Sequence, residues 1–177
     1  MESYKRHAKS ELTPEESAEL VAVDALADRL RSHIGDTAPE IKDLHVHGAQ
    51  SKAVQDHMAR LLKDELGFGE EVVLTPQTGL VTQARPDFFL PISGDRGVIA
   101  EVERGGATTN NHDLKDLWKA HVAPDVQHLF LIVPQSNWRA DGTSREKPFP
   151  LVARRLGAFF GSQRREIDVV SVHVFGY

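Results

Sequence analysis

Three carboxylates lie near one another in the middle of the sequence, at spacings that could bring them into one site. Asp87 lies near the start of one β-prone run, and Glu101 and Glu103 stand two residues apart in the next. Successive side chains of a strand alternate between faces, so Glu101 and Glu103 share a face. Counting outward from a hairpin turn centred on Asp95 pairs Asp87 with Glu103 and puts Asp87 diagonally across from Glu101. We therefore expect the three side chains to converge.

Such a cluster needs a positive charge nearby. Like charges across a strand pair destabilise the ladder and raise one another's pKa. A hard divalent cation removes that repulsion, and a few carboxylates with water and phosphate oxygens form a typical Mg²⁺ site, which Mn²⁺ could also occupy. The structural alternative is that Arg85, Arg96 and Arg104 neutralise the acids on a solvated sheet face. A bulge in the hairpin would also turn Asp87 to the other face.

The order of these motifs resembles the PD-(D/E)xK nuclease superfamily over roughly residues 48 to 134. Arg85-Pro86-Asp87 is followed fourteen residues later by Glu101-Val102-Glu103, and then by a helix and a buried strand. The resemblance implies a restriction endonuclease-like core in which Asp87, Glu101 and the backbone carbonyl of Val102 bind the metal. Glu103 stands where the superfamily usually has lysine, although some of its active restriction enzymes have Glu-x-Glu there.

The resemblance also implies roles in a hydrolytic reaction. The metal would polarise the scissile phosphate and lower the pKa of a water, while Glu103 would orient that water or accept its proton. Another cation must then replace the missing lysine. Arg104 should point to the opposite face, which leaves Lys115 and Lys119 on the following helix as candidates. His112, at the start of that helix, is a candidate contact for substrate phosphates.

Other side chains could take part, each with a structural alternative. The first core helix of the superfamily often supplies an acidic or amide residue, and Gln55 is the candidate, although a solvated helix position explains it too. His45 and His47 stand two apart in a run expected to be extended and could bind zinc, but no third ligand is near. Trp138, in a polar loop, could stack on a base, whereas Trp118 falls on a predicted core-facing stripe.

The elements that position these residues follow from hydrophobic periodicity. We expect a three-strand antiparallel meander at 71–75, 85–92 and 98–103, a helical crossover at 112–122 and a buried parallel strand at 128–133. Before the meander we expect a helix at 13–34 that begins with a capping box, a short extended run at 44–47 and a second helix at 51–66. After the buried strand we expect a third helix at 149–160 and a last strand at 167–175. The predicted fold class is α/β, with a mixed central sheet flanked by helices.

Length predicts a single domain over residues 1–177, and the resemblance implies that this domain is nuclease-like. Residues 1–47 form an N-terminal helical extension, 48–134 the core, and 135–177 a C-terminal helix and strand. The chain has no cysteine, which excludes disulfides, thiolate zinc sites and cysteine nucleophiles. With no apolar run of about eighteen residues and no apolar N-terminal signal segment, we expect a cytoplasmic protein that does not enter a membrane.

The net charge is -5, but residues 134–177 hold 7 basic and 4 acidic side chains, so a basic patch there could contact phosphates. The motifs of serine hydrolases, P-loop proteins and dinucleotide-binding folds are absent. The sequence thus predicts a metal-dependent DNA endonuclease of the restriction-enzyme type, with RNA as a substrate left open. By analogy with the superfamily it would be a homodimer, since one site cuts one strand. An inactive nuclease-like module that binds nucleic acid or regulates, and a structural domain with a neutralised acidic hairpin, are the alternatives.

Overall fold

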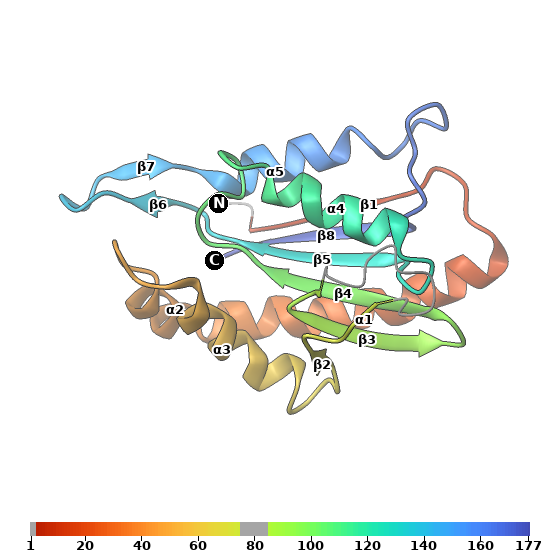
Figure 1. Ribbon diagram of the computed structural model, residues 1–177, viewed down its shortest axis with the longest axis horizontal. Coiled ribbons are helices and arrows are strands. Elements are labelled where there is room, and N and C mark those ends of the chain that lie inside the picture. The colour runs from red at the N-terminus through yellow and green to blue at the C-terminus, as the bar shows by residue number, and fades with distance from the viewer. Residues whose placement is uncertain (1–2, 75–84) are drawn as a thin grey trace.

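The protein is built on a six-stranded mixed β-sheet with helices on both faces (Figure 1). The computed structural model describes residues 3–74 and 85–177. Its strands are β1 (Tyr4–Ala8), β2 (Gly69–Glu70), β3 (Phe88–Ser93), β4 (Arg96–Val102), β5 (His128–Val133), β6 (Asn137–Trp138), β7 (Ser144–Glu146) and β8 (Ser171–Gly176). Its helices are α1 (Pro14–Asp36), α2 (Ala38–Leu44), α3 (Ser51–Leu62), α4 (His112–Val122) and α5 (Pro148–Gly157).

The strand order in the sheet is β1-β8-β5-β4-β3-β2. Strands β2, β3 and β4 form an antiparallel meander, and β4, β5 and β8 run parallel to one another. Helix α4 makes the crossover between β4 and β5, and β1 closes the other edge antiparallel to β8. The predicted α/β class, the meander and the parallel strand after a helical crossover are confirmed.

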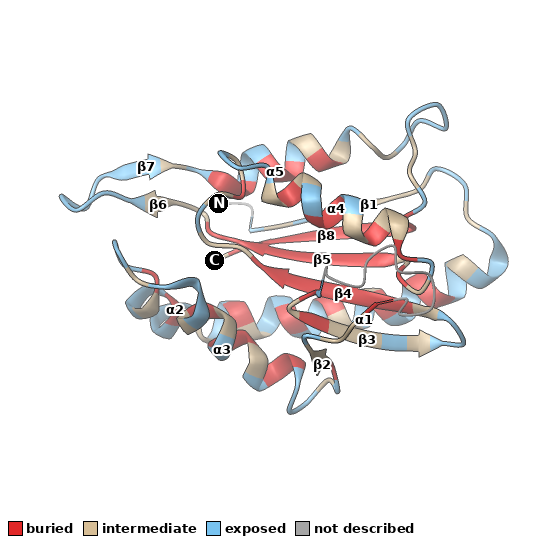
Figure 2. Ribbon diagram, in the orientation of Figure 1, coloured by how far each residue is buried: buried red, intermediate tan, exposed pale blue. Residues whose placement is uncertain are grey.

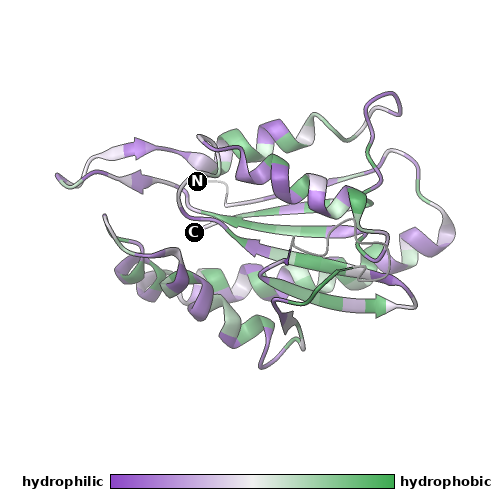
Figure 3. Ribbon diagram, viewed as in Figure 1, coloured by the Kyte–Doolittle hydropathy of each residue, from purple (hydrophilic) through white to green (hydrophobic). Residues whose placement is uncertain are grey.

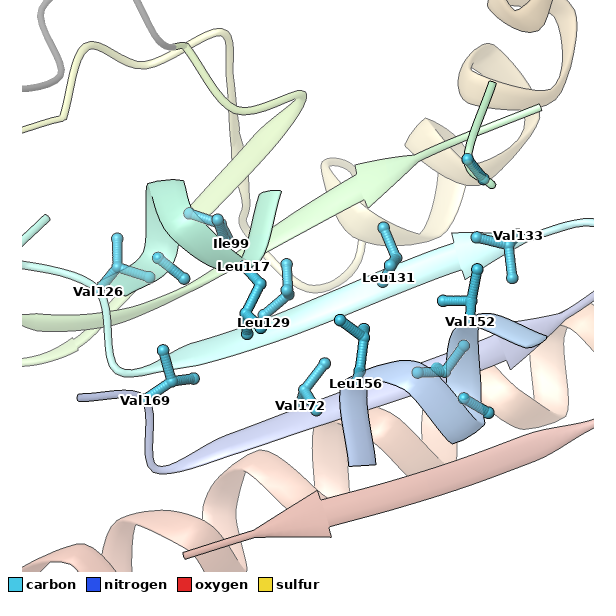
Figure 4. Close-up of a cluster of buried hydrophobic side chains, with 14 of the residues drawn as sticks. Ile99, Leu117, Val126, Leu129, Leu131, Val133, Val152, Leu156, Val169 and Val172 are labelled. Carbon is cyan, nitrogen blue, oxygen red and sulfur yellow. The ribbon is translucent and has the colours of Figure 1, made fainter. Parts of the chain in front are cut away.

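Each face of the sheet has its own core. Helices α4 and α5 pack on one face against Ile99 of β4 and Leu129 of β5, as Figure 4 shows. Helices α1, α2 and α3 pack on the other face, against Ala100 and Phe130 of the same two strands. All six residues of β5 are buried, as its apolar sequence predicted, and β4, β5 and β8 form the most buried part of the molecule (Figure 2). A side chain's position in β4 therefore decides which set of helices it meets.

The capping box at the start of α1 is confirmed, because Glu16 N donates to Thr13 Oγ1 and Thr13 N donates to Glu16 Oε2. The extended run predicted at 44–47 is wrong, since α2 continues the helical structure to Leu44. The first strand of the meander is Gly69–Glu70 rather than 71–75, because Glu71 adopts a positive φ of 51° that ends the strand. Residue 75 lies outside the described residues.

Three strands have no counterpart in the sequence prediction. Strand β1 is polar at several positions and pairs along the edge of the sheet. Strands β6 and β7 form a small hairpin within the segment predicted as a loop, and this hairpin projects from the body of the protein (Figure 1). In the described parts of the chain, no helix is long and apolar enough to cross a membrane.

A chain of buried polar groups joins α1 to the sheet. His128 Nε2 lies 2.7 Å from Glu19 Oε1, and His128 Nδ1 lies 2.6 Å from Ser171 Oγ. Arg96 donates to both oxygens of Glu19, at 2.7 and 3.0 Å. Because Ser171 and His128 are fully buried, the inner end of this chain of hydrogen bonds is closed to solvent and serves the packing of α1.

Replacing Glu19 by alanine is expected to destabilise the fold. The change leaves Arg96 and the buried His128 without their acceptor, which should lower the free energy of unfolding by about 3 kcal/mol. Glu15→Ala, an exposed glutamate in the first turn of the same helix, should lower it by less than about 1 kcal/mol. Chemical denaturation of both variants makes the comparison, and equal losses would mean that the buried hydrogen bonds contribute nothing.

Candidate active site

The predicted carboxylates meet at the carboxyl end of β4, where this mostly apolar strand becomes hydrophilic (Figure 3). Glu101 is on the face of β4 that α4 covers, and its side chain is 6% exposed. Its Oε2 accepts a hydrogen bond from Asp87 N at 3.1 Å. Asp87 Oδ2 in turn accepts from Val102 N at 2.8 Å. Together these two hydrogen bonds hold Asp87 beside Glu101.

The predicted pairing of Asp87 with Glu103 is wrong. Phe88 pairs with Ala100, so the register places Asp87 beside Glu101. The turn is shorter than we expected, because Ser93 pairs with Arg96, and an irregularity between Pro91 and Ser93 shifts the register by one further residue. The total difference from the counted register is two residues, which is one full period of a strand. Asp87 therefore stays on the face predicted for it.

Helix α4 brings a lysine and a fourth acid to the pair. Lys119 donates from Nζ to Glu101 Oε1 and lies 3.3 Å from Asp116 Oδ1. The side chains of Lys119 and Asp116 are 14% and 8% exposed. Lys119 was one of two candidates for the missing lysine, and it is the one at this site. Asp116 was not predicted as part of the carboxylate cluster.

Glu103 belongs to the same surroundings through a histidine. Its Oε2 lies 2.9 Å from His112 Nδ1, and the two side chains are 20% and 31% exposed. His112, which was predicted as a phosphate contact, pairs with the glutamate predicted to handle the proton. Glu103 and His112 are the more exposed pair of the site, whereas Glu101 and Lys119 lie deeper.

Burial and the proximity of several acids raise the pKa values of the carboxyl groups at this site. Burial and the charge of Asp116 raise the pKa of Glu101 to about 8, against the opposing effect of Lys119. Burial also raises the pKa of Asp116 to about 7, with Glu103 and Asp87 adding to the shift. The pKa values of Asp87 and Glu103 are raised too, again mainly by burial. The ammonium of Lys119 compensates this cluster only in part.

The donor set fits a hard divalent cation. The acidic side chains of the site offer oxygen atoms as ligands, which a hard divalent cation prefers. The buried Asp116 Oδ2 has no hydrogen-bond partner among the described residues. The N–H of Val102 points at Asp87, and in an extended strand the carbonyl of the same residue points to the same neighbour. Within residues 3–74 and 85–177, however, no three acidic or histidine side chains already surround one point as metal ligands. The positive charge that lies beside Glu101 is the ammonium group of Lys119.

Several predicted residues lie away from this cluster. Gln55 is on α3, which packs on the opposite face of the sheet, so the structure does not bring it to Glu101. Lys115 is exposed on α4. Arg104 points to the opposite face, as predicted, and donates to His45 Nδ1 and to the carbonyl of Val46. The two histidines predicted as a pair contact separate carbonyls, those of Ser136 and Trp138.

The position of α4 is fixed by an arginine from α5. Arg155 donates to both carboxylate oxygens of Asp113, a fully buried residue in the first turn of α4. It also donates to Asn111 Oδ1 and to the carbonyl of Ala107. Asn111 therefore uses its side chain on Arg155 and does not cap the start of α4 with it. This arrangement orients the helix that carries His112, Asp116 and Lys119.

No known protein-family model matches this chain, and no curated protein matches its sequence. The geometry of the site and the resemblance of its motifs are therefore the grounds for proposing a function.

Proposed function

We propose that the protein is a divalent-metal-dependent nuclease with a restriction endonuclease-like core. The observation that carries this proposal is the ammonium of Lys119, which reaches Glu101 from α4 on the face that also holds Asp87. The superfamily motif needs two acids and a lysine, and the lysine was missing from its usual place in β4. A lysine contributed by the neighbouring helix meets the same chemical need from another element.

Asp87, Glu101 and the carbonyl of Val102 would hold the cation, Mg²⁺ or Mn²⁺. The cation would supply Lewis-acid polarisation of the phosphate and a lowered pKa for the attacking water. Lys119 is placed to donate a hydrogen bond to a phosphate oxygen as negative charge develops on it. Glu103, supported by His112, is the more exposed acid and suits the role of proton acceptor.

We propose DNA as the substrate, with RNA left open, and a homodimer as the species that cuts both strands. Exposed basic residues of the β6–β7 hairpin and the residue after it, Arg139, Arg145 and Lys147, would contact the phosphate backbone. The hairpin is tied to the site, because Asn137 donates to the carbonyl of Arg104 and Glu146 accepts from Thr108. Contacts made by the hairpin could thus position a strand at Glu103.

A second candidate is a nuclease-like module that binds nucleic acid or regulates without cutting it. The ion pair between Lys119 and Glu101 favours this candidate, as does the lack of a ready set of three metal ligands in the described residues. The two candidates differ in what a metal ion does to the protein and to its substrate.

Cleavage of supercoiled plasmid decides between them. The wild-type protein with Mg²⁺ or Mn²⁺ should nick or linearise the plasmid, and chelation by EDTA should stop the reaction. Asp87→Asn should reduce the rate about a hundredfold or more, because it removes a negatively charged metal ligand. Asp95→Asn, which changes an exposed acid in the β3–β4 turn, is the matched control and should cut at the wild-type rate.

Equal cleavage by the wild type and Asp87→Asn would exclude this site as the source of the activity. Binding of the plasmid without any metal-dependent cleavage would favour the inactive module. A parallel assay with single-stranded RNA of the same length determines which nucleic acid is the substrate.

A further inference from the structure

A cavity of about 420 Å³ lies on the other side of β4 from the carboxylates. Helices α1 and α2 line it on one side, and the C-terminal end of β8 and the start of the β6–β7 hairpin line it on the other. Apolar side chains of Ile34, Ile41 and Phe175 contribute much of its wall. A cavity of this size, mostly apolar with a few polar groups, is typical of a site for a small ligand.

The aromatic and charged residues of the cavity indicate the chemistry of that ligand. Trp138 and Tyr177 both line it, and Trp138 is 42% exposed. Arg31 and Lys42 stand at its exposed edge, and none of the described residues that line it is acidic. In a chain with a net charge of -5, such a lining favours an aromatic ligand that carries negative charge.

We propose that this cavity binds one nucleotide, with its base beside Trp138 and Tyr177 and its phosphate near Arg31 and Lys42. Tryptophan and tyrosine rings stack on any base, and two cations suit a phosphate. The pair formed by Arg31 with Asp28 is exposed and 3.7 Å long, so it competes only weakly with a phosphate. The nucleotide could be free in solution or displaced from a nucleic acid strand. In the second case the inference rests on the proposed nuclease function.

The cavity communicates with the candidate active site through Tyr177. Its hydroxyl donates to the carbonyl of Glu103 at 3.2 Å, and the Glu103 side chain contacts His112. Arg104, the next residue, donates to His45, whose ring meets that of Tyr177 edge-on at 5.1 Å between centroids. A base bound beside Tyr177 would therefore contact the side chain whose hydroxyl holds the end of β4 in place.

Tryptophan fluorescence tests this inference without any need for cleavage. The chain has 2 tryptophans, so Trp118→Phe leaves Trp138 as the only reporter. This variant, combined with Glu101→Gln to prevent cleavage, is titrated with deoxyadenosine monophosphate, deoxyadenosine and inorganic phosphate. We expect the nucleotide to quench Trp138, the nucleoside to bind about tenfold more weakly, and phosphate alone to leave the signal unchanged.

Two matched changes make the result specific. Arg31→Ala with Lys42→Ala should weaken binding of the nucleotide about tenfold and leave that of the nucleoside unchanged. Trp138→Phe, which retains Trp118 on α4, should show no quenching. The inference is overturned if the nucleotide quenches the protein with Arg31→Ala and Lys42→Ala as well as it quenches the protein that retains both cations. It is also overturned if the nucleotide fails to quench Trp138, unless the next comparison detects a nucleotide held in a strand.

Duplexes with and without one unpaired adenine distinguish the two sources of the nucleotide. Stronger quenching by the duplex with the unpaired base identifies a nucleotide displaced from the strand, and quenching by the free nucleotide alone identifies a small-molecule ligand. No response to either would exclude the site. Because the variant does not cut, a failure of the proposed nuclease function leaves this binding result unaffected.

Discussion

Lys119→Met is expected to reduce metal-dependent cleavage by about a hundredfold to a thousandfold, the usual effect of removing one group that stabilises charge in the transition state. Lys119 is the cation that contacts Glu101 and Asp116, and methionine keeps most of the length of the side chain without its charge. The rate of plasmid nicking at saturating Mg²⁺ measures the effect. Saturation is needed because the change also removes the competitor of the metal ion for Glu101.

This competition separates a catalytic role from a structural one. If Lys119 only stabilised the fold, its loss would weaken the binding of Mg²⁺ together with the rate. If it acts on the phosphate, the apparent affinity for Mg²⁺ should stay equal or rise while the rate falls. Lys115→Met, one helical turn earlier and exposed, is the matched control and should cut within about twofold of the wild-type rate. Full activity in Lys119→Met would remove this lysine from the mechanism.

The hairpin shows why the composition of the site could be predicted but its register could not. Glu101 and Glu103 share a face whatever strand lies beside them, because side chains alternate. The partner of Asp87 depends on the number of residues in the turn and on the irregularity near Pro91, and neither leaves a clear signal in the sequence. Asp87 remained on the correct face only because the shift amounted to two residues.

Helix α4 shows how buried acidic residues mislead a prediction from hydrophobic periodicity. Of the stripe predicted from Leu114, Leu117 and Trp118, Leu117 is buried in the core and Leu114 packs against that core, but Trp118 is 64% exposed. The buried positions include Asp113 and Asp116, whose acids are paired with Arg155 and Lys119. Acids at positions 113 and 116, in register with Leu117 and Ala120, were the available signal. Sequence periodicity alone does not identify the partners that make such burial acceptable.

Short and edge strands escaped prediction for a different reason. Strand β1 is stabilised by pairing with β8 along five residues, and its polar side chains give little hydrophobic pattern. Strand β8 was predicted, at 167–175, although it begins only at Ser171. Its Ser171 and His173 are fully buried, and hydrogen bonds with His128 and Tyr4 satisfy them. The pattern of β5, by contrast, was predicted to the residue, since a strand buried on both faces has a continuous apolar sequence.

Glu101→Gln is expected to abolish cleavage and yet stabilise the protein at pH 8. The pKa of Glu101 is raised to about 8 from an ordinary value of 4.5, mainly by burial. Between these values the unfolded chain has lost a proton that the folded chain retains, so the free energy of unfolding falls as pH rises through this window. Glutamine has no charge to bury. The melting temperature of the variant should therefore exceed that of the wild type at pH 8 by about 2–4 °C for each kcal/mol regained.

Well below pH 4.5, where the wild-type Glu101 is protonated in both the folded and the unfolded state, the difference between the two proteins should disappear. Asp64→Asn, a change of an exposed carboxylate, controls for the loss of one negative charge and should give the same difference in melting temperature at both pH values. Mg²⁺ should stabilise the wild type at pH 8, raising its free energy of unfolding by about 2.7 kcal/mol at a hundredfold excess over the dissociation constant of the ion. The free energy of unfolding of Glu101→Gln should stay nearly unchanged. A variant that is destabilised at pH 8 would show that the ion pair with Lys119 outweighs the burial of Glu101. Stability gained together with activity lost would instead show that the charge at this position is retained for binding a cation rather than for folding.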